Sequence, residues 1–149
     1  MKKNRISKNW INKQNINFNN KLTNISNNTS LLAVQGPKAN EVIQKFVDFD
    51  LSQLKSYSFI KNDIKEIKEV IISTTGYTGS GGVELYVNNI DAIKLYNLLI
   101  ETGEYLGIKP IGLAARDTLR LEMGYCLYGN DIDDTISPIE AGLKWATKI

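Results

Sequence analysis

Residues 70–87 decide the fold of this chain, because three contrasting segments follow one another there: Val70–Thr74 (VIIST), Gly76–Gly82 (GYTGSGG) and Val83–Val87 (VELYV). The first segment is rich in β-branched residues, which favour strands. The middle segment supplies glycines that reach backbone conformations closed to other residues. Two strands that flank a glycine-rich turn predict a β-hairpin.

The second strand of this hairpin alternates between apolar and polar residues. Val83, Leu85 and Val87 are predicted to face the core, and Glu84 and Tyr86 to face the other way. Two interpretations of Glu84 stay open at this point. It is either an ordinary solvated charge, or a carboxylate lining a cleft, where it accepts two parallel N–H bonds from a planar heterocycle or a guanidinium.

Further elements are expected on both sides of the hairpin. Apolar runs and helical spacing predict strands at Ser30–Gln35, within Leu51–Ile60 and around Ile16–Leu22, and helices at Pro37–Val47, Ile90–Glu101, Gly112–Met123 and, after a capping box at Ser137–Glu140, residues 138–146. In the helix over Gly112–Met123, Leu113 and Leu119 are expected to face inward. Strands interleaved with helices predict an α+β fold with a mainly antiparallel sheet and flanking helices.

The composition excludes several kinds of chemistry. The 149 residues contain one cysteine and no histidine. An internal disulfide, a Cys/His zinc site and an imidazole general base are therefore impossible within this chain. No apolar run is long enough to span a membrane, and no signal-peptide core is recognisable. We therefore expect a cytoplasmic protein without a membrane partner.

The sequence also does not match the residue spacing of the common ligand-binding loops. No lysine follows the glycines of residues 76–82 as a phosphate-binding loop requires, and Glu84 stands where a dinucleotide loop needs its third glycine. The acidic run at residues 131–134 lacks the glycine and the distal glutamate of a calcium loop, so no metal site is expected. Cys126 has apolar neighbours and no basic residue beside it, so a core role is expected rather than a nucleophilic one.

The charge is distributed unevenly. Residues 1–40 carry seven basic side chains and no acidic one, whereas all sixteen acidic residues lie beyond them. Residues 1–28 hold ten of the sixteen asparagines and are interpreted as a basic, Asn-rich N-terminal segment, separate from residues 29–149. A basic arm suits nucleic acid. Its charges are dispersed and its aromatics few, however, so we expect no nucleic-acid partner.

Arginine is scarce, which draws attention to where it stands. The chain has fifteen lysines and three arginines, and two of these, Arg116 and Arg120, lie in one six-residue stretch. A guanidinium presents a planar fork of five donors that an ammonium cannot replace. Either residue can belong to a solvated helix face, to an ion pair with a neighbouring acid such as Asp117 or Glu122, or to a binding site.

Four stretches resemble one family. They are LLAVQGPKA (Leu31–Ala39), STTGYTGSGGVEL (Ser73–Leu85), GLAARDTLRLEMGYCLYGNDID (Gly112–Asp133) and SPIEAGLKWA (Ser137–Ala146). In order and spacing they are similar to the T-protein family of the glycine cleavage system, the aminomethyltransferases. The wider family also holds folate-dependent demethylases and a folate-binding protein of iron–sulfur cluster maintenance.

The resemblance implies a reaction and a site. Family members transfer a one-carbon unit from the aminomethyl-lipoyl arm of the H-protein to tetrahydrofolate and release ammonia. A carboxylate matching Glu84 hydrogen-bonds the pterin ring, an arginine matching Arg116 lies at the folate, and Tyr125 falls where some members place an aromatic against the ligand. Arg120 is interpreted as structural, in an ion pair that holds its helix.

The resemblance also implies what this chain lacks. The catalytic aspartate of the family lies upstream of the matched region, so no catalytic residue is assigned here. A C-terminal β domain follows that region in the family. Residues 29–149 are therefore expected to be the central folate-binding region, a fragment inactive without its flanking segments. The alternative is a non-catalytic or decayed folate-binding module of the same family.

Overall fold

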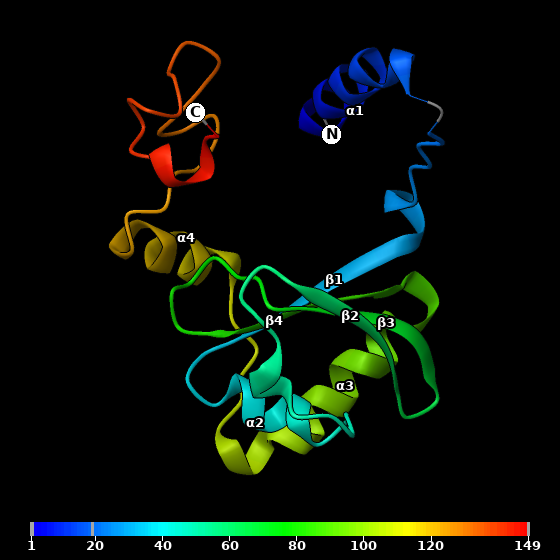
Figure 1. Ribbon diagram of the computed structural model, residues 1–149. Coiled ribbons are helices and arrows are strands. Elements are labelled where there is room, and N and C mark those ends of the chain that lie inside the picture. Colours follow the sequence, from blue (N-terminus) through cyan, green and yellow to red (C-terminus); the bar gives the residue numbers. More distant parts are fainter. Residues whose placement is uncertain (1, 19, 149) are drawn as a thin grey trace.

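A computed structural model describes residues 2–18 and 20–148, with side-chain surroundings described from residue 8 onward. Four α-helices and four strands form the regular structure of these residues (Figure 1): α1 (Lys2–Gln14), β1 (Thr29–Gln35), α2 (Ala39–Gln44), β2 (Phe59–Ile64), β3 (Ile67–Ser73), β4 (Gly82–Asn88), α3 (Ala92–Gly103) and α4 (Leu113–Glu122). None of the helices described is both long and apolar enough to cross a bilayer.

The four strands form one antiparallel sheet in the order β1-β4-β3-β2. β3 and β4 pair as the predicted hairpin, with Ile72 opposite Leu85 and Ser73 opposite Glu84. On the other side of β4, Ala33 of β1 lies opposite Glu84. The predicted α+β architecture is confirmed, and Glu84 lies on the central strand pair between two small residues.

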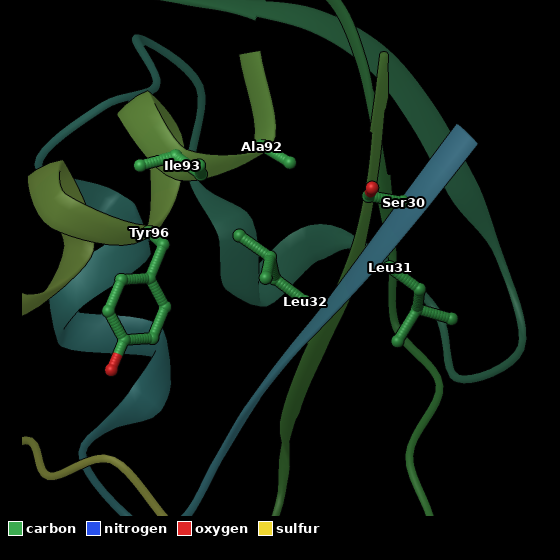
Figure 2. A pocket seen from close by; sticks show the side chains of 6 residues that line it. All are labelled: Ser30, Leu31, Leu32, Ala92, Ile93 and Tyr96. Carbon is green, nitrogen blue, oxygen red and sulfur yellow. The ribbon is translucent and has the colours of Figure 1, made fainter. Parts of the chain in front are cut away.

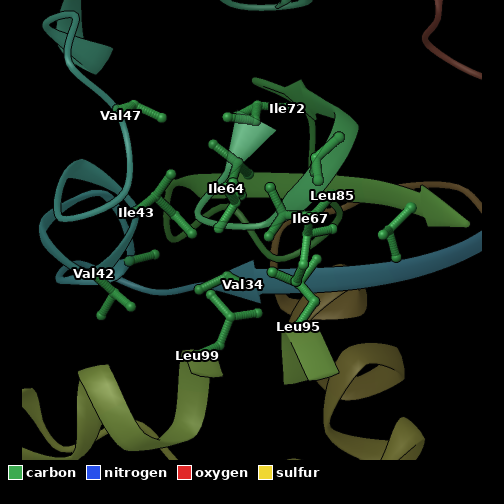
Figure 3. Close-up of a cluster of buried hydrophobic side chains, with 14 of the residues drawn as sticks. Val34, Val42, Ile43, Val47, Ile64, Ile67, Ile72, Leu85, Leu95 and Leu99 are labelled. Carbon is green, nitrogen blue, oxygen red and sulfur yellow. The ribbon is translucent and has the colours of Figure 1, made fainter. Parts of the chain in front are cut away.

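Helices α2 and α3 cover one face of the sheet (Figure 1), and the core lies between them and the strands. Figure 3 shows Leu85 of β4, Ile72 of β3, Ile43 of α2 and Leu95 of α3 converging there, each fully buried. Side chains alternate along a strand, so Glu84 and Tyr86 lie on the opposite face of the sheet. The predicted division of β4 into a core face and an outer face is confirmed.

The structure corrects the sequence prediction in the N-terminal segment. The strand expected around Ile16–Leu22 is wrong: α1 continues into a short 3-10 turn over Asn15–Asn17, and residues 20–25 are irregular, with residue 19 outside the described part. The Asn15 side chain donates to the Asn20 carbonyl at 3.0 Å. Such local side-chain bonds compete with strand pairing. In Figure 1, α1 lies away from the sheet, and the boundary near residue 28 stays a prediction.

The helix expected over residues 138–146 is also wrong, although its capping box is present. The Ser137 amide donates to the Glu140 carboxylate at 2.9 Å, and the Glu140 amide donates to the Ser137 hydroxyl at 3.2 Å. Gly142 has φ +72°, and the Leu143 amide donates back to the Pro138 carbonyl. This is a Schellman arrangement, which ends the segment after one turn. Only the 3-10 turn Lys144–Ala146 follows.

Other element boundaries, and the burial of one leucine, also differ from the prediction. The strand expected within Leu51–Ile60 begins only at Phe59, because Leu51–Gln53 forms a 3-10 turn whose Ser52 amide is capped by the Asp50 carboxylate. Helix α2 ends at Gln44, whose side-chain amide donates to the Phe49 carbonyl. Leu113, expected to face inward, is 80% exposed because it begins α4 at the margin of the sheet.

Candidate functional site

The Glu84 carboxylate is half-buried on the outer face of the sheet. The Thr75 hydroxyl donates to its Oε2 at 2.5 Å and lies 3.0 Å from the Ser73 hydroxyl oxygen. Among the described residues, no hydrogen bond engages the other oxygen, Oε1. The carboxylate is therefore held in one orientation through a single oxygen, while the second keeps its acceptor capacity for a ligand.

Tyr86 shares this face with Glu84, two residues further along β4. Its pKa is raised, first by burial of the phenol and then by the negative charge of Glu84. The phenol therefore stays protonated and neutral at physiological pH. Leu31 of β1 and Ile71 of β3 lie opposite Tyr86 in the register and complete an apolar border beside the carboxylate.

The loop between β3 and β4, residues 74–81, connects Glu84 to helix α4. Thr75 of this loop bonds Glu84, and two residues later the Tyr77 ring lies beneath Arg116, whose Cζ is 4.4 Å from the ring centroid. A guanidinium at this distance over an aromatic face makes a cation–π contact. The Tyr77 hydroxyl also donates to the backbone carbonyl of Cys126, which ties the loop to the segment after α4.

Tyr125 extends this stack. Its ring lies 5.9 Å from that of Tyr77, centroid to centroid, with 26° between the ring planes. Tyr125 is 38% exposed and Arg116 is exposed as well. Arg116, Tyr77 and Tyr125 therefore form a layered cluster that presents a planar cation and an aromatic edge to solvent.

Arg120 fixes the end of α4 and, among the contacts described, meets the stack only at the Tyr125 backbone carbonyl. Its side chain is 6% exposed; its Nε bonds Asp117 at 2.8 Å, and its Nη1 bonds Asp131 and the Tyr125 carbonyl. These bonds confirm the predicted structural ion pair, with Asp131 as an additional partner. The Leu127 amide, and next the Arg120 guanidinium, lower the pKa of Asp131.

The three residues expected to bind folate thus meet one loop without touching one another among the contacts described. Glu84 contacts it through Thr75, whereas Arg116 and Tyr125 contact it through Tyr77. A hollow of about 290 Å³ lies beside Arg116 and is lined by Leu113, Ala114, Arg116, Asp117 and Leu127. Glu84 does not line this hollow, so the two halves of the candidate site are linked by the loop and not by a shared cavity.

A second hollow, of about 370 Å³, lies at the free edge of β1 and belongs to a different region. Figure 2 shows Leu32, Ile93 and Tyr96 around it, between β1 and α3, with Leu31 on the other side of the strand. None of the residues expected to bind folate lines it. The described residues contain no cluster of acidic residues or cysteine suited to a metal ion.

Sequence reasoning missed three residues of this site: Thr75, Tyr77 and Gln35, whose side-chain amide donates to the Thr75 carbonyl at 3.3 Å. All three stood in stretches used for the family resemblance, yet nothing in their own patterning distinguished them. Thr75 and Tyr77 flank Gly76 at the start of a glycine-rich turn, where periodicity carries no information about side-chain direction. Cys126, expected in the core, is only half-buried, and its sulfur lies 3.8 Å from the Ala141 carbonyl oxygen.

Comparison with known proteins gives one family match along nearly the whole chain. The family model described as "GCVT N-terminal domain" matches residues 3–149. An aminomethyltransferase of Flavobacterium psychrophilum is 55% identical over 140 residues, 94% of this chain and 39% of that protein. An aminomethyltransferase of Bacteroides fragilis is 58% identical over 127 residues, 85% of this chain and 35% of that protein.

A solved structure agrees with these matches. The glycine cleavage system aminomethyltransferase T of Bartonella henselae superposes with a TM-score of 0.66 at 36% sequence identity. The match covers 79% of this chain and 30% of that one. The chain therefore spans well under half the length of the proteins it is similar to.

Proposed function

The chain belongs to the GCVT N-terminal domain family, and on that premise we propose that it supplies part of the tetrahydrofolate pocket of a glycine cleavage aminomethyltransferase. The family expected from the four sequence stretches is confirmed. Under this proposal Glu84, Arg116 and Tyr125 contact the folate. Catalytic residues are not assigned to this chain, and the cytoplasmic location inferred from the sequence is kept as part of the proposal.

The observation that carries the proposal is the loop of residues 74–81. One of its side chains orients the Glu84 carboxylate, and another supports the Arg116 and Tyr125 stack. A pterin presents adjacent N–H donors along one edge of a flat ring. A carboxylate on a rigid strand, with Oε1 available and a second acceptor site left on Oε2, can accept from both donors of that edge.

Arg116 supplies the complementary chemistry. The face of its guanidinium over Tyr77 is occupied, so its N–H groups and its other face remain for a ligand. These groups suit a carbonyl or carboxylate oxygen, or a second flat ring stacked on the cation. Tyr125 offers an aromatic surface beside it. Together they fit the remainder of a folate whose pterin edge is bound by Glu84.

In the proposed reaction this chain binds and orients, and the one-carbon chemistry belongs to the substrates. The aminomethyl-lipoyl arm of the H-protein supplies the one-carbon unit, tetrahydrofolate accepts it, and ammonia leaves. The described residues would hold the acceptor ring in place. Because the chain spans 39% of one relative and 35% of another, we propose that full transfer requires segments outside the matched region.

Calorimetric titration of the chain with tetrahydrofolate tests the proposal. Glu84→Gln keeps the shape of the side chain and removes its charge. We expect it to weaken binding by roughly 10- to 150-fold, the equivalent of losing about 1.5–3 kcal/mol in a charged hydrogen bond. Glu41→Gln, which removes an exposed carboxylate on α2, is the matched control and should change nothing.

Equal affinities in the wild type and Glu84→Gln would remove Glu84 from the site. A turnover assay with lipoylated H-protein then distinguishes the two functions proposed for this chain within the family. Transfer in the presence of the flanking segments indicates an aminomethyltransferase, whereas binding without transfer indicates the alternative, a folate-binding module without catalysis.

A further inference from the structure

The side-chain amide of Gln35 lies beneath the loop that joins the two halves of the site. Gln35 ends β1, and its Nε2 donates to the carbonyl oxygens of Val83 at 3.0 Å, Thr75 at 3.3 Å and Val34 at 3.3 Å. Its Oε1 accepts from the buried Thr78 hydroxyl at 3.1 Å. One amide thus joins β1, β4 and two points of the loop that are three residues apart.

The loop packs directly on this amide. A Cβ atom added to Gly76 would lie 2.0 Å from Oε1 of Gln35, a separation that two such atoms cannot adopt. Only glycine allows the backbone to come this close. The Gln35 amide therefore acts as the surface against which residues 75–78 are shaped, in addition to bonding them.

The residues on either side of Gly76 are the two that matter to the site. Thr75 bonds Glu84, and Tyr77 supports Arg116 and Tyr125. A shift of the loop would move both side chains together. We infer that Gln35 is a positioning residue. Through the loop it sets the orientation of the Glu84 carboxylate and the position of the Tyr77 ring that supports Arg116, and it does not contact the ligand itself. This inference rests on the proposed function.

The chain contains a matched control for this role. Like Gln35, Gln44 uses both ends of its amide: its Nε2 donates to the Phe49 carbonyl at 2.8 Å, and its Oε1 accepts from the Leu51 amide at 2.9 Å. It lies at the end of α2, on the core side of the sheet. Replacing either glutamine by leucine removes comparable hydrogen bonds, but only Gln35→Leu releases the loop.

Two measurements test the inference. In calorimetric titrations, Gln35→Leu should bind tetrahydrofolate about tenfold more weakly. This is the loss expected when the Thr75 bond to Glu84, about 1.4 kcal/mol, no longer orients the carboxylate. Gln44→Leu should bind as the wild type does. In the unliganded chain, the carboxylate ¹³C resonance of Glu84 should move in Gln35→Leu toward its position in Thr75→Val, and stay in place in Gln44→Leu.

The two measurements distinguish a failure of the positioning role of Gln35 from a failure of the proposed function. A wild-type chain that does not bind tetrahydrofolate would refute the proposed function, while the Glu84 resonance still reports on Gln35. An unmoved resonance in Gln35→Leu, or an affinity loss equal to that of Gln44→Leu, would overturn the positioning role. If Gln35→Leu does not fold, Thr78→Val leaves Gln35 in place, removes the donor to Oε1 together with the acceptor of the Ser80 amide, and must shift the resonance in the same direction.

Discussion

The hydrogen bond between Thr75 and Glu84 offers the sharpest perturbation, because Thr75→Val removes a hydroxyl and keeps the branched shape. The donor–acceptor distance is 2.5 Å, and the acceptor is a half-buried carboxylate. Hydrogen bonds to charged groups contribute about 1.5–3 kcal/mol. Partial exposure of Glu84 lets water replace part of the bond, so we take the lower end, about 1.5 kcal/mol, which corresponds to roughly tenfold in affinity.

Calorimetric titration with tetrahydrofolate measures this effect, and a double-mutant cycle tests its cause. If Thr75 acts only by orienting Glu84, Thr75→Val should weaken binding about tenfold in the wild type and hardly at all in Glu84→Gln. Thr29→Val removes a hydroxyl that donates to the Ile25 carbonyl at the far end of β1, and serves as the control. Additive losses in the double variant would show that Thr75 does not act through Glu84.

Two further predictions concern stability. Because the folded pKa of Asp131 is lowered by the Leu127 amide and by Arg120, its contribution is fully present above about pH 4 and is lost as pH falls through the folded pKa. Thermal melts of Asp131→Asn should therefore lose less Tm between pH 5 and pH 3 than the wild type, and equal slopes would contradict the assignment. Gly142→Ala should destabilise the chain by about 1 kcal/mol in urea unfolding, because alanine is strained at φ +72° even where its Cβ has open space; no change would remove the Schellman turn as a constraint.

The sequence was informative where periodicity was strong. The alternation of Val83, Leu85 and Val87 placed Glu84 on the outer face of β4, and the β-branched run before it predicted β3. Periodicity failed where local bonding decided the backbone. The capping box at Ser137 is present, but the left-handed conformation of Gly142 ends the segment after one turn, and the expected helix does not form.

The candidate site was predictable only in part, for a related reason. The roles expected of Glu84, Arg116 and Tyr125 came from a family resemblance, and they stay predictions until a ligand is measured. Thr75 and Tyr77 gain their positions from a loop conformation that Gln35, some forty residues earlier in the chain, helps to set. A contact of that sequence separation leaves no periodic signal.

The central claim is that one tetrahydrofolate molecule contacts both Glu84 and the Arg116–Tyr125 stack, which Thr75 and Tyr77 of the loop over residues 74–81 support. A crystal structure of the chain with tetrahydrofolate bound tests it most directly. The account predicts the pterin edge against Glu84 Oε1, with Arg116 or Tyr125 in contact with the same molecule. Tetrahydrofolate in the hollow between β1 and α3, with Glu84 and Arg116 both free of it, would contradict the account.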